Sequence, residues 1–335
     1  MEQKIYNEYV EILKEELLPA MGCTEPIAVA YAAAVAVQAL GEKPESVEVN
    51  VSANIIKNVK SVVVPCTGGL RGIGAAVCAG IVAGCPEKEL EILEEITGEQ
   101  KVEMKKMLDT MPMTIRESDK EYIFDIQIKS CAGGHSGYVE IAGFHTNVIC
   151  VKKDDEIIRE KAYEEQGSSC ATDRSLLTVE KIIEFADCVD VADVEEVLQR
   201  QIDYNWAIAE EGMTGKWGAA IGKTLMEAYG NSVHNRAKAM AAAGSDARMN
   251  GCELPVVINS GSGNQGMTTS LPVIVYAKEL NVSKEMMLRA LVVSNLITIH
   301  MKTGIGRLSA YCGAISAGCG AGAGICYLYG GRAYE

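Results

Sequence analysis

The chain has 335 residues, of which 48% are hydrophobic and 23% charged, as is typical of a globular protein of about two domains. The 45 acidic residues outnumber the 31 basic ones, the formal net charge is -14, and only three Phe and two Trp are available for base stacking, so nucleic acid is not an expected partner. The twelve cysteines are irregularly spaced and no signal peptide opens the sequence, which excludes a secreted disulfide scaffold and predicts a cytoplasmic protein with free thiols.

Two apolar stretches have to be weighed as membrane spans. A span needs about 20 strongly apolar residues. The stretch at 26–40 is too short, and the stretch at 311–330 consists mostly of Gly and Ala. Both predict buried helices whose small side chains allow close packing, and no membrane partner is expected.

The first predicted element is an amphipathic helix. Apolar residues recur at helical spacing between charged ones from residue 2 to residue 18, and Pro19 and Gly22 end the pattern. A second, Ala-rich helix is predicted at 26–40. The turn between the two helices carries Cys23.

The pattern then changes to that of a sheet. Val47, Val49 and Val51 alternate with polar residues, which is the period of a half-buried strand, and residues 122–128 alternate in the same way. Further strands are predicted at 138–143 and 146–152, and helices near 74–83, 87–95 and 99–109. We expect residues 45–165 to form an α+β domain with a mainly antiparallel sheet.

Helical patterns return after residue 174. Asp193 and Glu196 form a candidate capping box, and Ser283 is a candidate N-cap for a later helix. Residues 1–44 and 166–335 are therefore predicted to form one mainly helical, Gly/Ala-rich domain, into which the sheet domain of residues 45–165 is inserted. The expected fold class is α+β.

Several loops combine glycine with polar side chains, as happens where a backbone approaches a ligand or another backbone closely. They are MGCTEP at 21–26, PCTGGLRGIG at 65–74, CAGGHSG at 131–137, NSGSGNQGMTTS at 259–270 and GIGRLSAYCGAISAGCGAGAG at 304–324.

The loop at 259–270 contains a GxGxxG dinucleotide fingerprint. That fingerprint requires a βαβ unit with an acidic residue about 20 positions on, whereas Pro272 interrupts the segment that follows, so nucleotide binding is not favoured. Ser262, Asn264 and Gln265, within a nest of backbone N–H groups, favour binding of a carboxylate instead. The alternative is a Gly-rich helix junction without a ligand.

The cysteines form no CxxC pair, so neither a zinc ribbon nor a thioredoxin-like motif is indicated. Cys78, Cys150 and Cys188 lie in apolar runs and are expected to be small core residues.

Three other thiols occupy more distinctive positions. Cys23 lies in a turn beside Thr24 and Glu25, and Cys312 and Cys319 lie in an uncharged Gly-rich stretch that can pack around an inorganic cluster. A cluster held by three thiolates leaves one iron open for substrate. A buried, inert thiol is the alternative for each of the three.

Together, GCTEP, the IIKNV segment leading to TGG, AGGH, GSGNQG, and LSAYCG followed by AGAGI resemble the oxygen-sensitive L-cysteine desulfidases and the α-chain of iron-sulfur L-serine dehydratases. The resemblance covers essentially the whole chain, and the motifs are specific as an ordered set. It implies a 4Fe-4S cluster with three cysteine ligands and one open iron, and an enzyme that needs no pyridoxal phosphate.

By this resemblance Cys23 is the first cluster ligand and Cys312 the second. The family's third ligand lies in a CDGAK-like segment, which does not occur before Glu335. Either the chain is truncated, which we favour, or Cys319 substitutes, or the cluster does not assemble. Cys66 before TGG is a second departure, and no role is assigned to it.

The implied reaction is β-elimination of L-cysteine to pyruvate, ammonia and sulfide through aminoacrylate. The same residues suit dehydration of L-serine, and a cluster-free relative that binds a small amino acid is the alternative from another class. The expected partner is thus a small amino acid, and the apolar ending favours self-association.

The substrate carboxylate has two candidate sites. One is the nest at 261–266, and the other consists of Thr67, Gly68, Gly69 and Arg71. Thr24, which follows Cys23 in the sequence, is a further candidate for contact with the substrate.

The candidate bases are His135, in a predicted strand-edge turn, and Lys302, after a long apolar helix where desolvation favours a neutral amine. A water-facing histidine and a solvated lysine are the alternatives. Glu25 is expected to orient the Cys23 turn.

Overall fold

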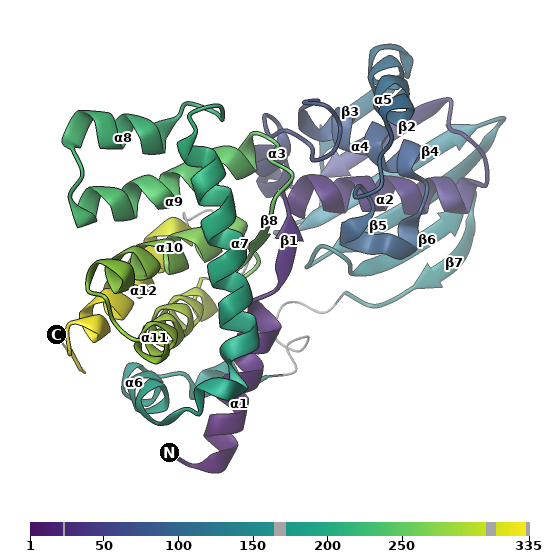
Figure 1. Cartoon of the computed structure of the whole chain (residues 1–335). Coiled ribbons are helices and arrows are strands. Elements are labelled where there is room, and N and C mark those ends of the chain that lie inside the picture. The colour runs from purple at the N-terminus through teal and green to yellow at the C-terminus, as the bar shows by residue number, and fades with distance from the viewer. Residues whose placement is uncertain (23, 164–171, 306–312, 333–335) are drawn as a thin grey trace. The chain divides into compact units, whose positions relative to one another are not determined.

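A computed structural model describes residues 1–22, 24–163, 172–305 and 313–332 (Figure 1). The chain forms two compact units, a helical unit of Met1–Gly22 with Cys170–Glu335, and a sheet unit of Cys23–Ser169. The predicted α+β class is confirmed. No helix in these described ranges has the length and apolarity to span a membrane.

The sheet unit is built on a six-stranded sheet of order β3-β2-β4-β5-β6-β7. Every neighbouring pair is antiparallel except β2 and β3, so the mainly antiparallel sheet predicted from the alternation is confirmed. The strands are β2 (Ser46–Val51), β3 (Met113–Glu117), β4 (Asp125–Ala132), β5 (His135–Ala142), β6 (Val148–Lys153) and β7 (Glu156–Glu160).

The Ala-rich helix α2 (Thr24–Leu40) lies against this sheet, packing on β4 and β5, and also against α4 (Gly72–Ala83). Its small side chains allow close approach on two sides. A Cβ at Gly137 of β5 would overlap the carbonyl oxygen of Ala36, and a Cβ at Gly80 of α4 would overlap that of Ala30. The structure therefore places α2 in the sheet unit, and the first boundary lies at residue 22 instead of residue 44.

The described part of the sheet unit also contains three further helices: α3 (Ala53–Val59), η1 (Pro86–Glu91) and α5 (Gly98–Thr110). The helix predicted at 87–95 is wrong in extent. It is a short 3-10 helix, and Glu89 within it has a positive φ of 47° that stops regular helix.

The helical unit contains the remaining elements. They are α1 (Gln3–Glu16), β1 (Pro19–Met21), η2 (Arg174–Leu176), α6 (Val179–Cys188), η3 (Val191–Asp193), α7 (Glu195–Met213), α8 (Ile221–Tyr229), α9 (Val233–Met249), β8 (Pro255–Val257), α10 (Gly263–Glu279), α11 (Lys284–Thr303) and α12 (Gly313–Leu328).

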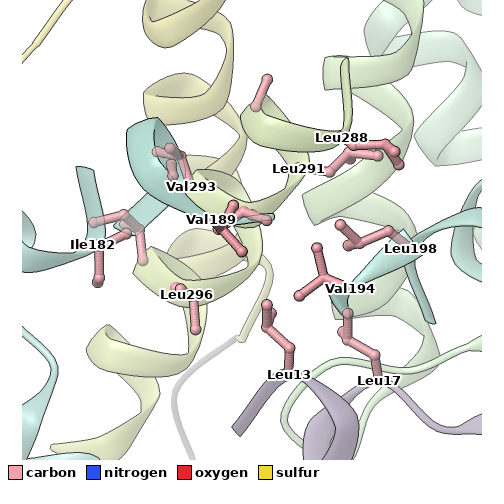
Figure 2. Close-up of a cluster of buried hydrophobic side chains, with 14 of the residues drawn as sticks. Leu13, Leu17, Ile182, Val189, Val194, Leu198, Leu288, Leu291, Val293 and Leu296 are labelled. Carbon is pink, nitrogen blue, oxygen red and sulfur yellow. The ribbon is translucent and has the colours of Figure 1, made fainter. Parts of the chain in front are cut away.

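The main core of this unit gathers around α11. Figure 2 shows Leu13 and Leu17 below Val194 and Leu198, with Leu288 and Leu291 of α11 on the other side of these two residues, so segments distant in sequence share one apolar cluster. Burial of such aliphatic side chains stabilises the fold by about 1.5–3 kcal/mol each.

The two predicted helix caps have different outcomes. Ser283 caps α11, because its hydroxyl accepts a hydrogen bond from the Met286 N–H at 3.2 Å. The capping box at Asp193 and Glu196 is wrong, because Asp193 ends η3 and Val194 precedes α7 without a side-chain cap. The Asp193 carboxylate instead accepts a hydrogen bond from the Tyr6 hydroxyl.

Helix α12 packs against α10 and α11 through glycine. A Cβ at Gly320 would overlap the Thr298 hydroxyl and the Ser294 carbonyl, and a Cβ at Gly324 would lie within 3.0 Å of Val273 and of the Ala290 carbonyl. Gly318, on the same helix, has nothing within 4 Å.

Gly320→Ala should destabilise the protein by about 1–3 kcal/mol, because the added methyl group forces α12 away from α11. Gly318→Ala is the matched control and should leave stability unchanged or raise it by up to about 1 kcal/mol through helix propensity. Urea unfolding of the two variants measures this, and equal stabilities would contradict the tight α11–α12 contact.

Candidate functional site

The Gly-rich loop before α10 closes on itself. Asn259 and Ser262 exchange two backbone hydrogen bonds of 3.1 Å each, and Ser260 and Gly261 between them have φ of 50° and 78°, as a tight type I′ turn requires. The N–H groups of this turn are thus partly used within it. The donors that can face a ligand are those of the first turn of α10, which have no partner inside the helix.

Ser262 is the N-cap of α10, and its hydroxyl accepts from the Gln265 N–H. The strand before the loop, β8, pairs with β1 in antiparallel fashion. This arrangement differs from the parallel βαβ unit that a dinucleotide fingerprint needs. Pro272 lies inside α10, so the interruption of the helix expected there is wrong.

A buried amide network fixes this loop to the neighbouring helices. The Asn259 side-chain amide donates to Asn295 Oδ1 at 2.9 Å, and Asn295 exchanges hydrogen bonds of 3.0 and 2.8 Å with Gln201. All three side chains are fully buried. Each link is specified by paired donors and acceptors, so α7, the loop and α11 are held in one arrangement.

A second set of polar contacts fixes the register of α10 against α11. The Thr269 and Thr298 hydroxyls lie 3.2 Å apart, and the Ser294 hydroxyl donates to the Thr269 carbonyl at 2.7 Å. Helices α10 and α11 run antiparallel. Gln265 lies one turn before Thr269 in α10, and Lys302 lies one turn after Thr298 in α11, so the two residues lie at the same level along the helix pair.

The residues at this level are buried and polar. Gln265 is 5% exposed and Lys302 is 4% exposed, and Gln265 Oε1 has no hydrogen-bond partner among the described residues. Gly313, the first residue of α12, packs so closely on the Gln265 amide that a Cβ there would overlap it. The N-termini of α10 and α12 and a buried lysine therefore gather at one end of the helical unit, and helix N-termini and cations both favour anions.

A buried arginine lies at the same helix N-terminus. Arg248, in the last turn of α9, is 3% exposed, donates to Asn264 Oδ1 at 3.1 Å, and packs against Gly263. Arg248 is not among the site residues predicted from the sequence. An isolated arginine before a loop gives no local signal of burial, and only the packing of α9 on α10 brings it to the site.

Thr24 and Glu25 begin α2 in the sheet unit. The Thr24 hydroxyl and the Asn58 amide each lie 3.3 Å from a Glu25 carboxylate oxygen, and Thr24 is buried. Glu25 is therefore positioned by neighbouring groups at the start of the helix, which fits an orienting role for the segment that follows Cys23.

In the TGG turn, which was predicted to bind the substrate carboxylate, Thr67 is used within the turn. The Thr67 hydroxyl donates to the Val64 carbonyl at 2.7 Å and accepts from the Leu70 N–H, so it stabilises the turn itself. Gly68 and Gly69 are exposed with φ of 74° and 97°, and Arg71 donates to the Ser61 carbonyl. Arg71 and the two glycines remain accessible to an anion, while Thr67 does not.

His135 lies far from Glu25. It begins β5 with a side chain that is 61% exposed, and its Nδ1 is 3.0 Å from Asp154, whose pKa it lowers. The same hairpin contacts Leu40 through Gly137, at the C-terminal end of α2. Since α2 begins at Thr24, the length of the helix separates the two places by about 24 Å.

Cys23 and Cys312, the two thiols favoured as ligands, lie outside the described residues. The described helices α2 and α12 begin directly after them in sequence. Cys319 is exposed on α12, beside Gly320, whose backbone faces α11. Within the described ranges, no group of three His, Cys, Asp or Glu side chains is arranged to hold a metal ion.

The cysteines expected in the core are buried in two of three cases. Burial raises the pKa of the Cys78 thiol to about 12 and also raises the pKa of Cys150, which keeps both protonated and inert. Cys188 is exposed at the end of α6, so its assignment to the core is wrong.

A family model described as serine dehydratase alpha chain matches residues 87–335. Among curated proteins, a UPF0597 protein of Desulfitobacterium hafniense is 57% identical over 330 residues, which are 98% of this chain and 77% of the relative. Others from Lachnoclostridium phytofermentans and Treponema denticola are 51% and 43% identical, covering 98% and 100% of this chain and 78% and 79% of the relatives. No solved structure matches the chain.

Asn295→Leu should destabilise the helical unit by about 2–4 kcal/mol, because the Gln201 and Asn259 amides lose their buried partner. Gln201→Leu is the matched comparison and should cost less, since Asn295 keeps its bonds to Asn259 and to the Leu291 carbonyl. Chemical unfolding ranks the two variants, and the reverse order would contradict a central role for Asn295.

Proposed function

The chain belongs to the serine dehydratase alpha-chain family, and we propose that it is a 4Fe-4S-dependent lyase that eliminates the β-substituent of a small amino acid, with L-cysteine as the preferred substrate. The observation that carries the proposal is the end of the helical unit where α10 and α12 begin beside Gln265 and the buried Lys302. A site of this kind suits an anionic substrate.

The sequence positions of Cys23 and Cys312 support cluster ligation. Each cysteine directly precedes, in sequence, the first residue of a described helix, and a helix N-terminus favours the thiolate form that a metal requires. Gly313, next to Cys312 in sequence, packs on the buried Gln265 amide. Cys319 fits less well because it lies on the exposed face of α12, so we do not assign it as the third ligand.

A bound cluster with an open iron would supply a Lewis acid for the departing sulfur or hydroxyl group. The protein's own groups perform the remaining tasks. The backbone N–H groups of the first turn of α10, which Ser262 caps, hold the substrate carboxylate, and the Thr269–Thr298 contact keeps that turn level with Lys302. Glu25 orients the start of α2 through its contact with Asn58.

Lys302 is the better of the two candidate bases. It is buried at the same level as Gln265, whereas the His135 side chain is 61% exposed and lies beside Asp154. We therefore assign removal of the α-proton to Lys302.

Anaerobically purified protein should contain iron and acid-labile sulfide and should release sulfide and pyruvate from L-cysteine. Cys312→Ser and Cys23→Ser should each lose most of the iron and the activity, because thiolate ligands are removed. Cys319→Ser is the matched control and should keep both. Full turnover by iron-free protein would refute the proposal.

L-Serine dehydration is the second candidate, and the serine dehydratase alpha-chain match favours it specifically. Pyruvate formation from L-serine and from L-cysteine, measured side by side without oxygen, ranks the two substrates. A higher kcat/KM for L-serine would reassign the enzyme to the dehydratases.

Lys302→Met should lower kcat by about 100-fold or more with the iron content unchanged, as expected for loss of a general base. His135→Asn should retain at least about half of the turnover. If Lys302→Met turns over at the wild-type rate, Lys302 is not the base, and if His135→Asn loses turnover while keeping its iron, the histidine takes that role.

A further inference from the structure

Arg248 is a buried cation for which the described residues provide no carboxylate. Two other buried charges have opposite partners: Glu16 pairs with Arg174 at 2.6 Å, and Glu140 pairs with Lys120. Within the described part of the chain, Arg248 makes no ion pair and its Nε has no hydrogen-bond partner. Burying a guanidinium without an anion costs folding free energy, so a buried arginine at this point is expected to have a negatively charged partner.

The surroundings of the guanidinium define where that anion belongs. Nε and Cζ lie against Gly263, the first residue of α10, so closely that any side chain there would displace them. Nη1 donates to Asn264 Oδ1, a neutral oxygen that orients the guanidinium without balancing its charge. The N–H groups of Gly263 and Asn264, which have no partner within α10, and the arginine therefore present donors at the same place.

We propose that Arg248 and the first turn of α10 bind the α-carboxylate of the amino-acid substrate, an inference that rests on the proposed lyase function. A planar guanidinium pairs with a carboxylate through two parallel hydrogen bonds, which fixes orientation as well as affinity. The carboxylate then lies at the N-terminus of α10, and Lys302 lies on the neighbouring helix α11.

The carboxylate is common to cysteine and serine, so Arg248 selects for α-amino acids without distinguishing the leaving group. Amines that lack the carboxylate, such as cysteamine and ethanolamine, should be neither bound nor turned over.

Asn264→Asp is the most informative variant. It places a carboxylate beside Arg248 with almost no change in shape, and an acidic residue in the first turn of a helix is itself favourable. Stability should be equal or higher, while the KM for the substrate should rise by about tenfold or more because the new side chain occupies the guanidinium. A purely structural arginine would give the stability gain with an unchanged KM.

Arg248→Lys tests the same site by changing the guanidinium itself. KM should rise by about tenfold or more with kcat altered much less, and Arg248→Ala should be partly rescued by added guanidinium ion but not by sodium chloride. If both Asn264→Asp and Arg248→Lys keep the wild-type KM, the carboxylate is bound elsewhere.

A binding assay separates this inference from the proposed reaction. L-Alanine, which has no leaving group, should raise the melting temperature of the wild-type protein, and L-alaninamide should not. The shift should disappear in Asn264→Asp, whether or not the wild type forms pyruvate. Equal shifts by the acid and the amide would overturn the role of Arg248, while a wild type that binds L-alanine but makes no pyruvate would overturn only the lyase function.

Discussion

The contact between Thr269 and Thr298 fixes the register of α10 against α11, and the candidate site depends on that register. A slip of one residue between α10 and α11 would move Lys302 off the level of Gln265. Hydroxyl and amide pairs suit this task, because a buried polar group left without its partner costs about 1–3 kcal/mol, whereas aliphatic contacts tolerate sliding.

Small residues perform the complementary task in both units. In the sheet unit, Gly137 and Gly80 let the backbone of α2 approach β5 and α4. In the helical unit, Gly313, Gly320 and Gly324 let α12 lie against α10 and α11. The apolar, uncharged stretches that superficially suggest membrane spans are thus explained by close packing within each unit.

Much of this could be predicted from the sequence, for identifiable reasons. The alternation at Val47, Val49 and Val51 reports a sheet with one covered face, and Ser283 carries a local capping signal. The placement of α2 could not be predicted, since its Ala-rich surface has no polar face to indicate which partner it packs on.

The candidate site was only partly predictable. Ser262, Asn264 and Gln265 were found because glycine marked their loop, but Arg248 and the level shared by Gln265 and Lys302 arise from packing between separate helices. The placement of His135 is likewise non-local, because its distance from Glu25 is set by the length of α2 and by the hairpin that contacts its far end.

The most direct test of the account is an anaerobic crystal structure of the iron-loaded protein with L-alanine bound. We predict the alanine carboxylate at about 3 Å from the Arg248 guanidinium and the first N–H groups of α10, with a cluster bonded to Cys312. Alanine bound away from α10, or iron held without Cys312, would contradict it.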